Sequence, residues 1–378
     1  MLFLYLITFL HRIVFLISRK HNLNKKIANN RTDLMLAIIH HKDYRKYDLG
    51  EDHPLIGDKP ERTVQFFKEK SIFSYADLFT PRKATEKEIS SVHDEDYIQL
   101  VKTLSQTGGM LALDTPAPKG IYDIAALACG GSILAAEKLY EGYNYSINTL
   151  GGFHHASIRA SSGFCFFNDI AIAIEYIRHK KRIRRFLIID LDVHHANGTQ
   201  DIYYSDPSVL NISFHQDGRT LYPGSGFIHE IGEGEGKGFT INMPFLPGTG
   251  NESYFYAFEE LVPFFIEEFK PEMIIYQSGV DTHHLDPLAQ INLTLPFYFT
   301  IAKEIKNLVD RSCRRLAILL GGGYNSLSSI KSYYNIAAAI VDKEQIMEGE
   351  IKDPNVEETK RRIKELKKIL RPYWNFKK

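Results

Sequence analysis

The sequence predicts an α/β fold in which a mostly parallel sheet lies between layers of helices. From Met35 onward, short β-prone runs alternate with helical stretches, which is the pattern of strands joined by crossover helices. The run 186–189 is apolar without interruption, as expected of a strand buried on both faces of a parallel sheet. No linker rich in Pro, Gly or Ser divides the chain, so we predict a single domain over residues 35–378.

The individual elements follow from local patterns. Apolar residues recur at helical spacing over 121–140, and Gly142 follows as a stop signal. Residues 168–181 also have a helical pattern. Residues 356–370 carry an apolar stripe among charges, which favours a surface helix docked on the domain over a helix that binds a partner. Strands are predicted at residues 36–39, 145–148, 186–191, 209–214, 273–278 and 316–320.

Residues 1–34 are expected to lie outside this fold as an apolar and basic extension. Residues 2–17 are mostly Leu, Ile, Phe and Val, and a basic run at 19–26 follows them. This order of charges does not fit a cleaved signal peptide, and the apolar run is shorter than the roughly 20 residues of a spanning helix. Two alternatives stay open: membrane association through residues 1–26, or translation that starts at Met35.

Composition and charge exclude several classes of protein. The 378 residues carry no net formal charge, so no general field favours nucleic acid or an anionic membrane, and we predict no direct nucleic-acid binding. The three cysteines are widely spaced, which indicates a reducing, cytoplasmic location and excludes a cysteine-based zinc site. The basic run 178–185 is typical of a solvated helix end, with a targeting or anion-binding patch as the alternative.

The end of the predicted strand 186–191 carries a cluster of metal-seeking side chains. Asp190, Asp192 and His194 are spaced two residues apart, so along an extended backbone they point the same way. They would line the crevice where open α/β sheets bind ligands. Two neighbouring carboxylates repel one another unless a cation or hydrogen bonds offset their charge. A metal site is one interpretation, and a strand end that reaches solvent is the other.

A pair of histidines, His154 and His155, is the second candidate. Four such pairs occur in the chain, so the dipeptide alone decides nothing. This pair differs because Leu150-Gly-Gly-Phe precedes it and Gly163-Phe-Cys-Phe-Phe-Asn168 follows it. Small residues permit a close approach of backbone to substrate, which favours a functional site over two solvent-exposed loop histidines.

Taken together, the motifs resemble the zinc-dependent histone deacetylase family, which includes acetoin-utilisation proteins and acetylpolyamine amidohydrolases. The resemblance runs in order from about Met35 to about Ala339 and implies the three-layer arginase-deacetylase fold, with about eight strands. The matching segments are Gly152-Phe-His-His155, Gly163-Phe-Cys165, Asp190-x-Asp-x-His194, Tyr222-Pro-Gly224, Gly279-x-Asp281 and Gly321-Gly-Gly-Tyr324.

The resemblance implies a role for each residue of the metal centre and the catalytic group. Asp192, His194 and Asp281 would bind one catalytic Zn²⁺, leaving positions for water and substrate. The resemblance also implies K⁺ beside the zinc, held by Asp190, Asp192, His194 and the backbone around Ser213 and Phe214.

The same resemblance implies that His155 is the general base toward a zinc-activated water and that His154 is its electrostatic partner. Asp190 would orient His154, and Asn197 would orient His155. Many family members have Asp where this chain has Asn197, and the amide should leave His155 less basic. Tyr324 would donate its hydroxyl to the developing oxyanion.

For substrate binding, the resemblance implies a narrow tunnel. Phe164 and Tyr222 would form its walls, Gly163 its throat, and Asp114 its rim. This shape suits an acetylated lysine of a protein, possibly a histone, and acetylpolyamines or other small amides are the alternative substrates. A departure from the family pattern lies after His53-Pro54, where five residues precede Pro60-Glu-Arg62. A two-manganese ureohydrolase and a non-catalytic acetyl-lysine binding module fit the motifs less well.

Overall fold

Eight strands form one sheet in the order β2-β1-β5-β10-β9-β6-β7-β8. The computed structural model describes residues 36–55 and 57–376, so the extension predicted over residues 1–34 lies outside the described residues. The chain from Leu36 onward forms one compact unit. Its sheet strands are β1 (Leu36–Ile39), β2 (Ala76–Phe79), β5 (Tyr145–Asn148), β6 (Phe186–Asp190), β7 (Val209–Gln216), β8 (Thr240–Phe245), β9 (Met273–Gln277) and β10 (Leu316–Leu319).

All pairings in this sheet are parallel, and the central strands start in register. Leu36 lies opposite Tyr145, and Tyr145 lies opposite Leu316. Phe186 lies opposite Met273 in the same way, and Asp190 lies opposite Gln277 at the other end of these strands. The sheet therefore has one edge of strand beginnings and one of strand ends, and polar residues at the ends of β6 and β9 become neighbours.

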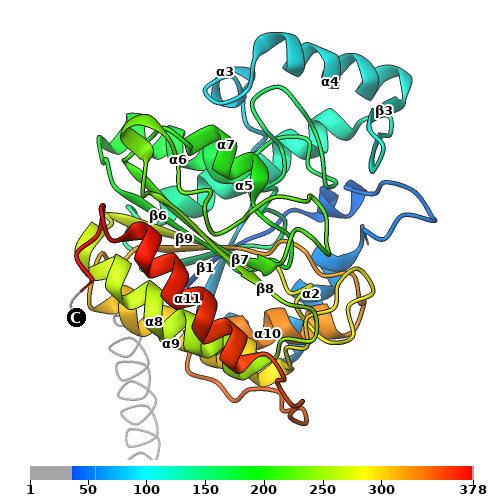
Figure 1. The fold of residues 1–378 in the computed structure, drawn as a ribbon. Coiled ribbons are helices and arrows are strands. Elements are labelled where there is room, and N and C mark those ends of the chain that lie inside the picture. Colours follow the sequence, from blue (N-terminus) through cyan, green and yellow to red (C-terminus); the bar gives the residue numbers. More distant parts are fainter. Residues whose placement is uncertain (1–35, 56, 377–378) are drawn as a thin grey trace, which may run out of the picture. The chain divides into compact units, whose positions relative to one another are not determined.

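Helices cover both faces of the sheet (Figure 1), which confirms the three-layer α/β/α class. One layer contains α5, α6 and α7, and the other contains α8, α9, α10 and α11. A small hairpin of β3 (Gly109–Ala112) and β4 (Thr115–Ala117) lies apart from the sheet. The helices are α2 (Lys59–Glu69), α3 (Glu86–Ile89), α4 (Glu95–Thr107), α5 (Ile121–Lys138), α6 (Asp169–Lys181), α7 (Asn197–Tyr203), α8 (Asn251–Phe269), α9 (Leu295–Asp310), α10 (Ser328–Ile340) and α11 (Val356–Leu370), with short 3₁₀ turns at Lys42–Lys46, Ile72–Ser74 and Gly234–Gly236.

The predicted strands are all present, with ends that shift by one or two residues. The sequence reasoning missed β2 and β8, which are the two edge strands of the sheet. Half of β2 is exposed and it spans four residues, whereas β8 contains Pro244, a residue that weakens a strand pattern but is tolerated at an edge. Helix α11 packs on α8 and β8, which confirms the predicted surface docking.

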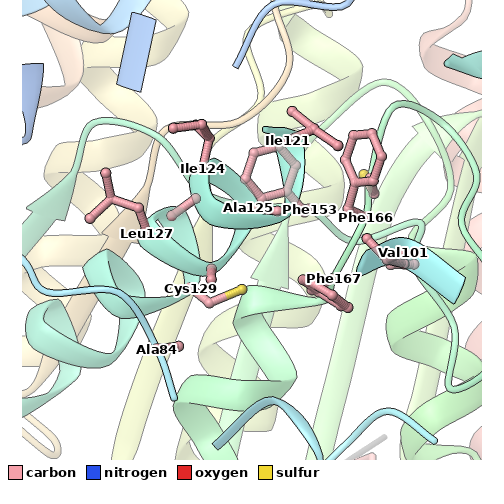
Figure 2. Packing of buried hydrophobic residues seen from close by; sticks show 14 of the residues in the cluster. Ala84, Val101, Ile121, Ile124, Ala125, Leu127, Cys129, Phe153, Phe166 and Phe167 are labelled. Atoms are coloured by element: carbon pink, nitrogen blue, oxygen red, sulfur yellow. The ribbon is translucent and has the colours of Figure 1, made fainter. Parts of the chain in front are cut away.

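A cluster of buried apolar side chains fixes the loop that carries the histidine pair (Figure 2). Phe153, Phe166 and Phe167 are buried against residues of α5 such as Ile121 and Ala125. Phe153 directly precedes His154 in the sequence. Buried aromatic side chains therefore hold the loop on one side of the histidines. Because they are closely packed, they resist displacement.

None of the described helices combines the length and the apolar character that a membrane crossing requires.

Candidate metal centre and active site

The three predicted metal ligands converge at the carboxyl ends of β6 and β9. Asp192, His194 and Asp281 are buried, and one ligand atom of each lies within 4.8 Å of the others. His194 Nδ1 lies 3.1 Å from Asp192 Oδ1 and 3.1 Å from Asp281 Oδ2. Ligand atoms held about 2.0–2.1 Å from a tetrahedral ion lie about 3.3 Å apart, so the donor set fits a small divalent ion.

Backbone groups hold the outer oxygen atoms of these carboxylates. The Val193 N–H donates to Asp281 Oδ1 at 2.8 Å, which leaves Oδ2 facing His194. Space for the carboxylates comes from Gly279 and Gly322, because a Cβ at either position would overlap with Asp192 Oδ2. The centre is thus pre-formed by the fold around it.

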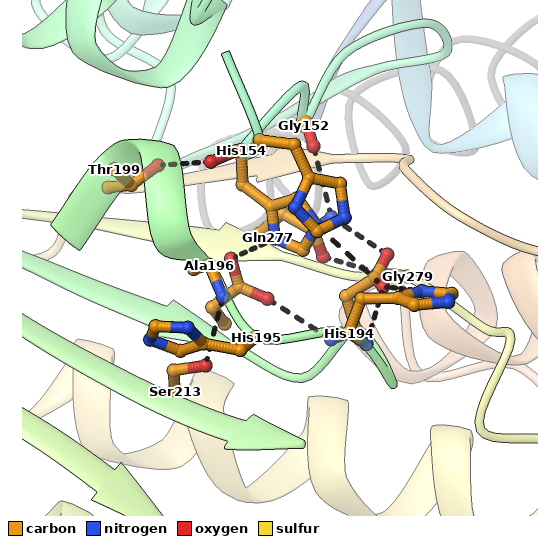
Figure 3. A network of polar contacts seen from close by, with 12 residues as sticks. Gly152, His154, His194, His195, Ala196, Thr199, Ser213, Gln277 and Gly279 are labelled. Carbon is orange, nitrogen blue, oxygen red and sulfur yellow. Dashed lines mark hydrogen bonds and ion pairs between the residues drawn. The ribbon is translucent and has the colours of Figure 1, made fainter. Parts of the chain in front are cut away.

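Gln277 links the metal centre to the histidine loop (Figure 3). Its side-chain N–H donates to the Gly152 carbonyl and to Asp192 Oδ2, each at 3.1 Å. Its Oε1 accepts the N–H of Gly279 at 2.7 Å. The sequence reasoning missed Gln277, although its place at the end of a buried strand beside Asp190 was a usable signal.

The two histidines face one another, and each is held by the residue expected from the sequence. His154 Nδ1 lies 2.8 Å from Asp190 Oδ2, and His155 Nδ1 lies 2.6 Å from Asn197 Oδ1. The two Nε2 atoms are 3.1 Å apart. Since Asn197 Oδ1 can only accept, Nδ1 of His155 carries the proton in this pair, and its Nε2 is left as an acceptor.

The surroundings give the two rings different proton affinities. Burial favours the neutral form, but the carboxylates of Asp190 and Asp192 raise the pKa of His154 to about 9. Burial lowers the pKa of His155 well below its ordinary value, and the nearby His154 and His194 lower it further. Burial and repulsion from Asp192 raise the pKa of Asp281 to about 7, which is the cost of crowded carboxylates that a cation would offset.

A cavity in front of the metal ligands is lined by His154, His155, Gly163, Phe164, Asp192 and Tyr324. The rings of Phe164 and Tyr324 lie 5.7 Å apart, edge to face. Tyr222 lies over the other side of the histidines, with its ring 5.2 Å from His155 and 6.2 Å from His194. The structure thus brings Phe164 and Tyr222, the histidines and Tyr324 to one place.

Asp114 lies at this site, but its carboxylate has partners within the chain. Oδ2 accepts the N–H of Gly163 at 3.0 Å, and Oδ1 accepts the hydroxyl of Thr115 at 2.8 Å. The backbone of Phe164 is also held, because its carbonyl accepts the Tyr47 hydroxyl at 2.7 Å. Asp114 therefore fixes the backbone of Gly163 beside the cavity.

Lys59 is a further residue that the sequence reasoning missed. It is buried, and its Nζ donates to the carbonyls of Gly321 and Gly323, each at 3.0 Å. Burial lowers the pKa of Lys59 to about 8. It ends the insertion after His53-Pro54 and begins α2. A lysine at the start of a helix has no periodic pattern that would reveal a buried contact with the glycine-rich turn before Tyr324.

His283, His284 and Glu348 form a second group with the composition of a metal site. His283 Nδ1 accepts the N–H of Leu285 at 3.2 Å, so its Nε2 carries the proton that Glu348 Oε2 accepts at 3.0 Å. Glu348 also accepts from His284 and from the Leu295 N–H. These hydrogen bonds already occupy the side-chain atoms that could bind a metal. We therefore interpret the group as a structural contact that joins the C-terminal segment to the loop after Asp281.

Comparisons with known proteins agree with this geometry. Residues 53–340 match the model of the histone deacetylase domain. A probable deacetylase of Archaeoglobus fulgidus is 34% identical over 361 residues, covering 90% of this chain and 99% of that protein. The acetoin utilization protein AcuC of Bacillus subtilis is 36% identical over 297 residues, covering 76% of each chain.

A solved structure has the same fold as this chain. The crystal structure of the HDA15 HD domain superimposes with a TM-score of 0.81 at 25% identity, covering 90% of this chain and 95% of that chain. Sequence, site geometry and fold therefore agree, and the chain belongs to the histone deacetylase family.

Proposed function

We propose that the protein is a zinc-dependent deacetylase that hydrolyses the acetyl amide of acetylated lysine side chains in proteins. The observation that carries this proposal is the convergence of Asp192, His194 and Asp281 beside the His154–His155 pair in one cavity. Family membership supports deacetylation in general. The oxygen and nitrogen donor set supports Zn²⁺, which takes three protein ligands and keeps an open position in catalytic sites.

The proposed metal would act as a Lewis acid on the amide carbonyl and would make the attacking water more acidic. His155 would accept the proton of this water at Nε2 and later deliver it to the leaving amine as the C–N bond breaks. Asn197 keeps the required tautomer by its bond to Nδ1. Asp190 holds His154 in place, and the Tyr324 hydroxyl would donate to the carbonyl oxygen as negative charge develops there.

We propose that K⁺ binds next to the zinc through Asp190, Asp192 and His194. Asp190 lies opposite Ser213 in the pairing of β6 with β7, so the backbone at Ser213 and Phe214 runs beside the end of β6 and could supply carbonyl oxygens. Hard oxygen donors of this kind suit an alkali cation.

The substrate would enter as an extended alkyl chain between Phe164 and Tyr222. The aromatic side chains suit the methylene stem of acetyl-lysine, and the cavity lining also includes the polar side chains of His154, His155 and Asp192. Acetylpolyamines have the same stem and remain the second candidate.

Tyr324→Phe tests the mechanism. The variant should keep its metal and lose most of its turnover of an acetylated peptide, because an oxyanion donor is typically worth about 3 kcal/mol, or about 10²-fold in kcat. Unchanged turnover would refute this role. A substrate panel of acetylated peptides, acetylputrescine and acetylspermidine tests the substrate class, and higher kcat/KM for the polyamines would overturn the first choice.

A further inference from the structure

The edge of the sheet opposite the active site carries a group of cations, which we call the basic edge. It is formed by the segments that precede three neighbouring strands, β6, β9 and β10. All of its members except Arg315 are exposed, and Arg315 is half-buried. They are Lys181, Arg182, Arg184, Arg185, Lys270, Arg311, Arg314 and Arg315.

These cations differ from others nearby because they have no carboxylate partner. None of the eight lies within 4.0 Å of a carboxylate oxygen in residues 36–55 and 57–376. By contrast, Arg178 pairs with Asp206 and Lys180 pairs with Glu137. The charges of the basic edge are therefore available to an external anion.

The acidic residues next to the basic edge offset only part of its charge. Burial alone would raise the pKa of Glu272, but its backbone hydrogen bonds and the nearby charges of Arg185 and Arg315 lower it. Glu272 accepts the backbone N–H groups of Arg184 and Arg185 at 2.9 and 3.1 Å, and Asp310 contacts the Tyr145 hydroxyl. Glu267 and Glu268 are exposed one turn earlier on α8. The cations outnumber these four acids two to one.

The register of the sheet brings the cations close together. The first residue of β10 lies opposite the second residue of β9, and the first residues of β9 and β6 lie opposite one another. Neighbouring strands are about 4.8 Å apart. The three segments thus span about 10 Å along the sheet. β1 is parallel to them and starts in the same register, so Leu36 lies on this edge as well.

The sequence that precedes Leu36 adds an independent observation. An apolar run at 2–17 is followed by a basic run at 19–26, a combination typical of segments that associate with a lipid surface. Stable membrane binding by weak apolar segments needs a second signal, and a cluster of Lys and Arg is such a signal.

We propose that the basic edge binds an anionic lipid surface. The active site at the opposite ends of the strands would then face the aqueous phase, where its substrates are. A nucleic acid offers the same negative charge, but it has no apolar phase for residues 2–17 to enter, so a lipid surface fits both observations. This inference does not depend on the proposed deacetylation.

Vesicle binding by the full chain tests the proposal. The test variant replaces Lys181, Arg184 and Arg311 by Glu. We leave Arg182, Lys270 and Arg314 unchanged because their backbones are left-handed, with φ of 57°, 52° and 56°. Co-sedimentation would use vesicles of phosphatidylcholine alone and vesicles with added phosphatidylglycerol. We expect binding to the anionic vesicles that weakens with salt. Each lost cation near the surface costs about fivefold in partitioning, so the variant should bind on the order of 10²-fold more weakly.

A matched control replaces Lys42, Lys87 and Lys119, exposed cations outside the basic edge, by Glu. It should bind the vesicles like the unaltered chain. Deacetylation of an acetyl-lysine peptide and thermal unfolding report whether the variants are folded. If the Glu variant does not fold, Lys181→Gln, Arg184→Gln and Arg311→Gln replace it, with a smaller loss expected.

Three outcomes would overturn the proposal. The first is equal binding to neutral and anionic vesicles, and the second is retention of binding by the folded variants. The third is a tighter, equally charge-dependent association with a DNA duplex, which would assign the basic edge to nucleic acid.

Discussion

At the scale of single residues, Asp169 joins the start of α6 to the loop of the histidine pair. Its buried carboxylate accepts the N–H groups of Gly152 and Phe153 at 3.0 and 2.7 Å, and it also accepts the Ser132 hydroxyl. A single acceptor group thus fixes the two backbone units that directly precede His154. We assign Asp169 a positioning role in the proposed reaction.

Asp169→Asn should lower kcat more than it changes KM. The amide can accept one of the two N–H groups but presents its own N–H to the other, and an unsatisfied buried group costs about 1–3 kcal/mol. A displacement of about 1 Å in the loop can cost on the order of 10²-fold in rate. Steady-state kinetics on the folded variant measure this split. Asp123→Asn, which alters an exposed carboxylate on α5 paired with Lys83, should leave both constants unchanged.

Gly322 keeps the space in which the metal ligands meet. A Cβ there would overlap with Asp281 Oδ2 and Asp192 Oδ2, so Gly322→Ala should displace at least one carboxylate. We expect loss of bound metal together with activity, measured as metal content after dialysis. Gly349→Ala is the control, because the space around Gly349 is open. Full metal content in the Gly322 variant would show that the centre is less rigid than its geometry indicates.

At the scale of elements, Arg362 attaches α11 to the sheet. Its guanidinium donates to Asp217 Oδ2 at 2.8 Å and to the Pro244 carbonyl at 2.9 Å, and both it and Asp217 are buried. Asp217 begins the loop that carries Tyr222. Helix α11 therefore holds the start of the loop that carries Tyr222.

Arg362→Met should destabilise the protein by about 3 kcal/mol, because removal of one partner leaves a buried charge poorly compensated. Burial alone would raise the pKa of Asp217, but the Arg219 N–H and the Arg362 side chain lower it below its usual value. A carboxyl with a lowered pKa adds stability above its unfolded pKa of about 4, and that stability is lost as the pH falls through the folded value. The difference in unfolding free energy between the unaltered protein and Arg362→Met should thus become smaller at acidic pH.

Urea unfolding at neutral pH and at acidic pH measures both effects. Arg361→Met is a matched control, since Arg361 pairs with Glu358 and Glu365 on the exposed side of the same helix. Such surface pairs contribute about 0–1 kcal/mol. An equal loss of stability in the two variants would contradict a special role for Arg362.

At the scale of the whole molecule, the bound metal should contribute to stability as well as to catalysis. Two carboxylates and an imidazole are buried together, and a ligand that binds only the folded state stabilises it. Treatment with a chelator should lower the melting temperature and abolish deacetylation, and added Zn²⁺ should restore both. A melting temperature that does not respond to chelation would argue against a divalent ion at Asp192, His194 and Asp281.

The sequence predicted most strands of the sheet and the candidate metal ligands, but it did not predict some of the residues that support the site. Asp190, Asp192, His194 and Asp281 could be placed together because parallel strands bring their ends to one edge of a sheet. Lys59 and Asp169 could not, because their roles depend on which loops they contact after folding, and local patterns do not encode such contacts. The edge strands β2 and β8 were missed for a related reason, since exposure and Pro244 remove the usual apolar signal.

The pairing of β6 with β9 has a consequence for how the protein matures. Asp192 and Asp281 follow strands that are paired in the sheet, yet they are far apart along the chain. A growing polypeptide that ends before β9 cannot enclose an ion, however much of its first half has folded. Loading with the proposed metal would thus be a late event in biogenesis, and a shortage of the ion would leave complete chains with an empty centre.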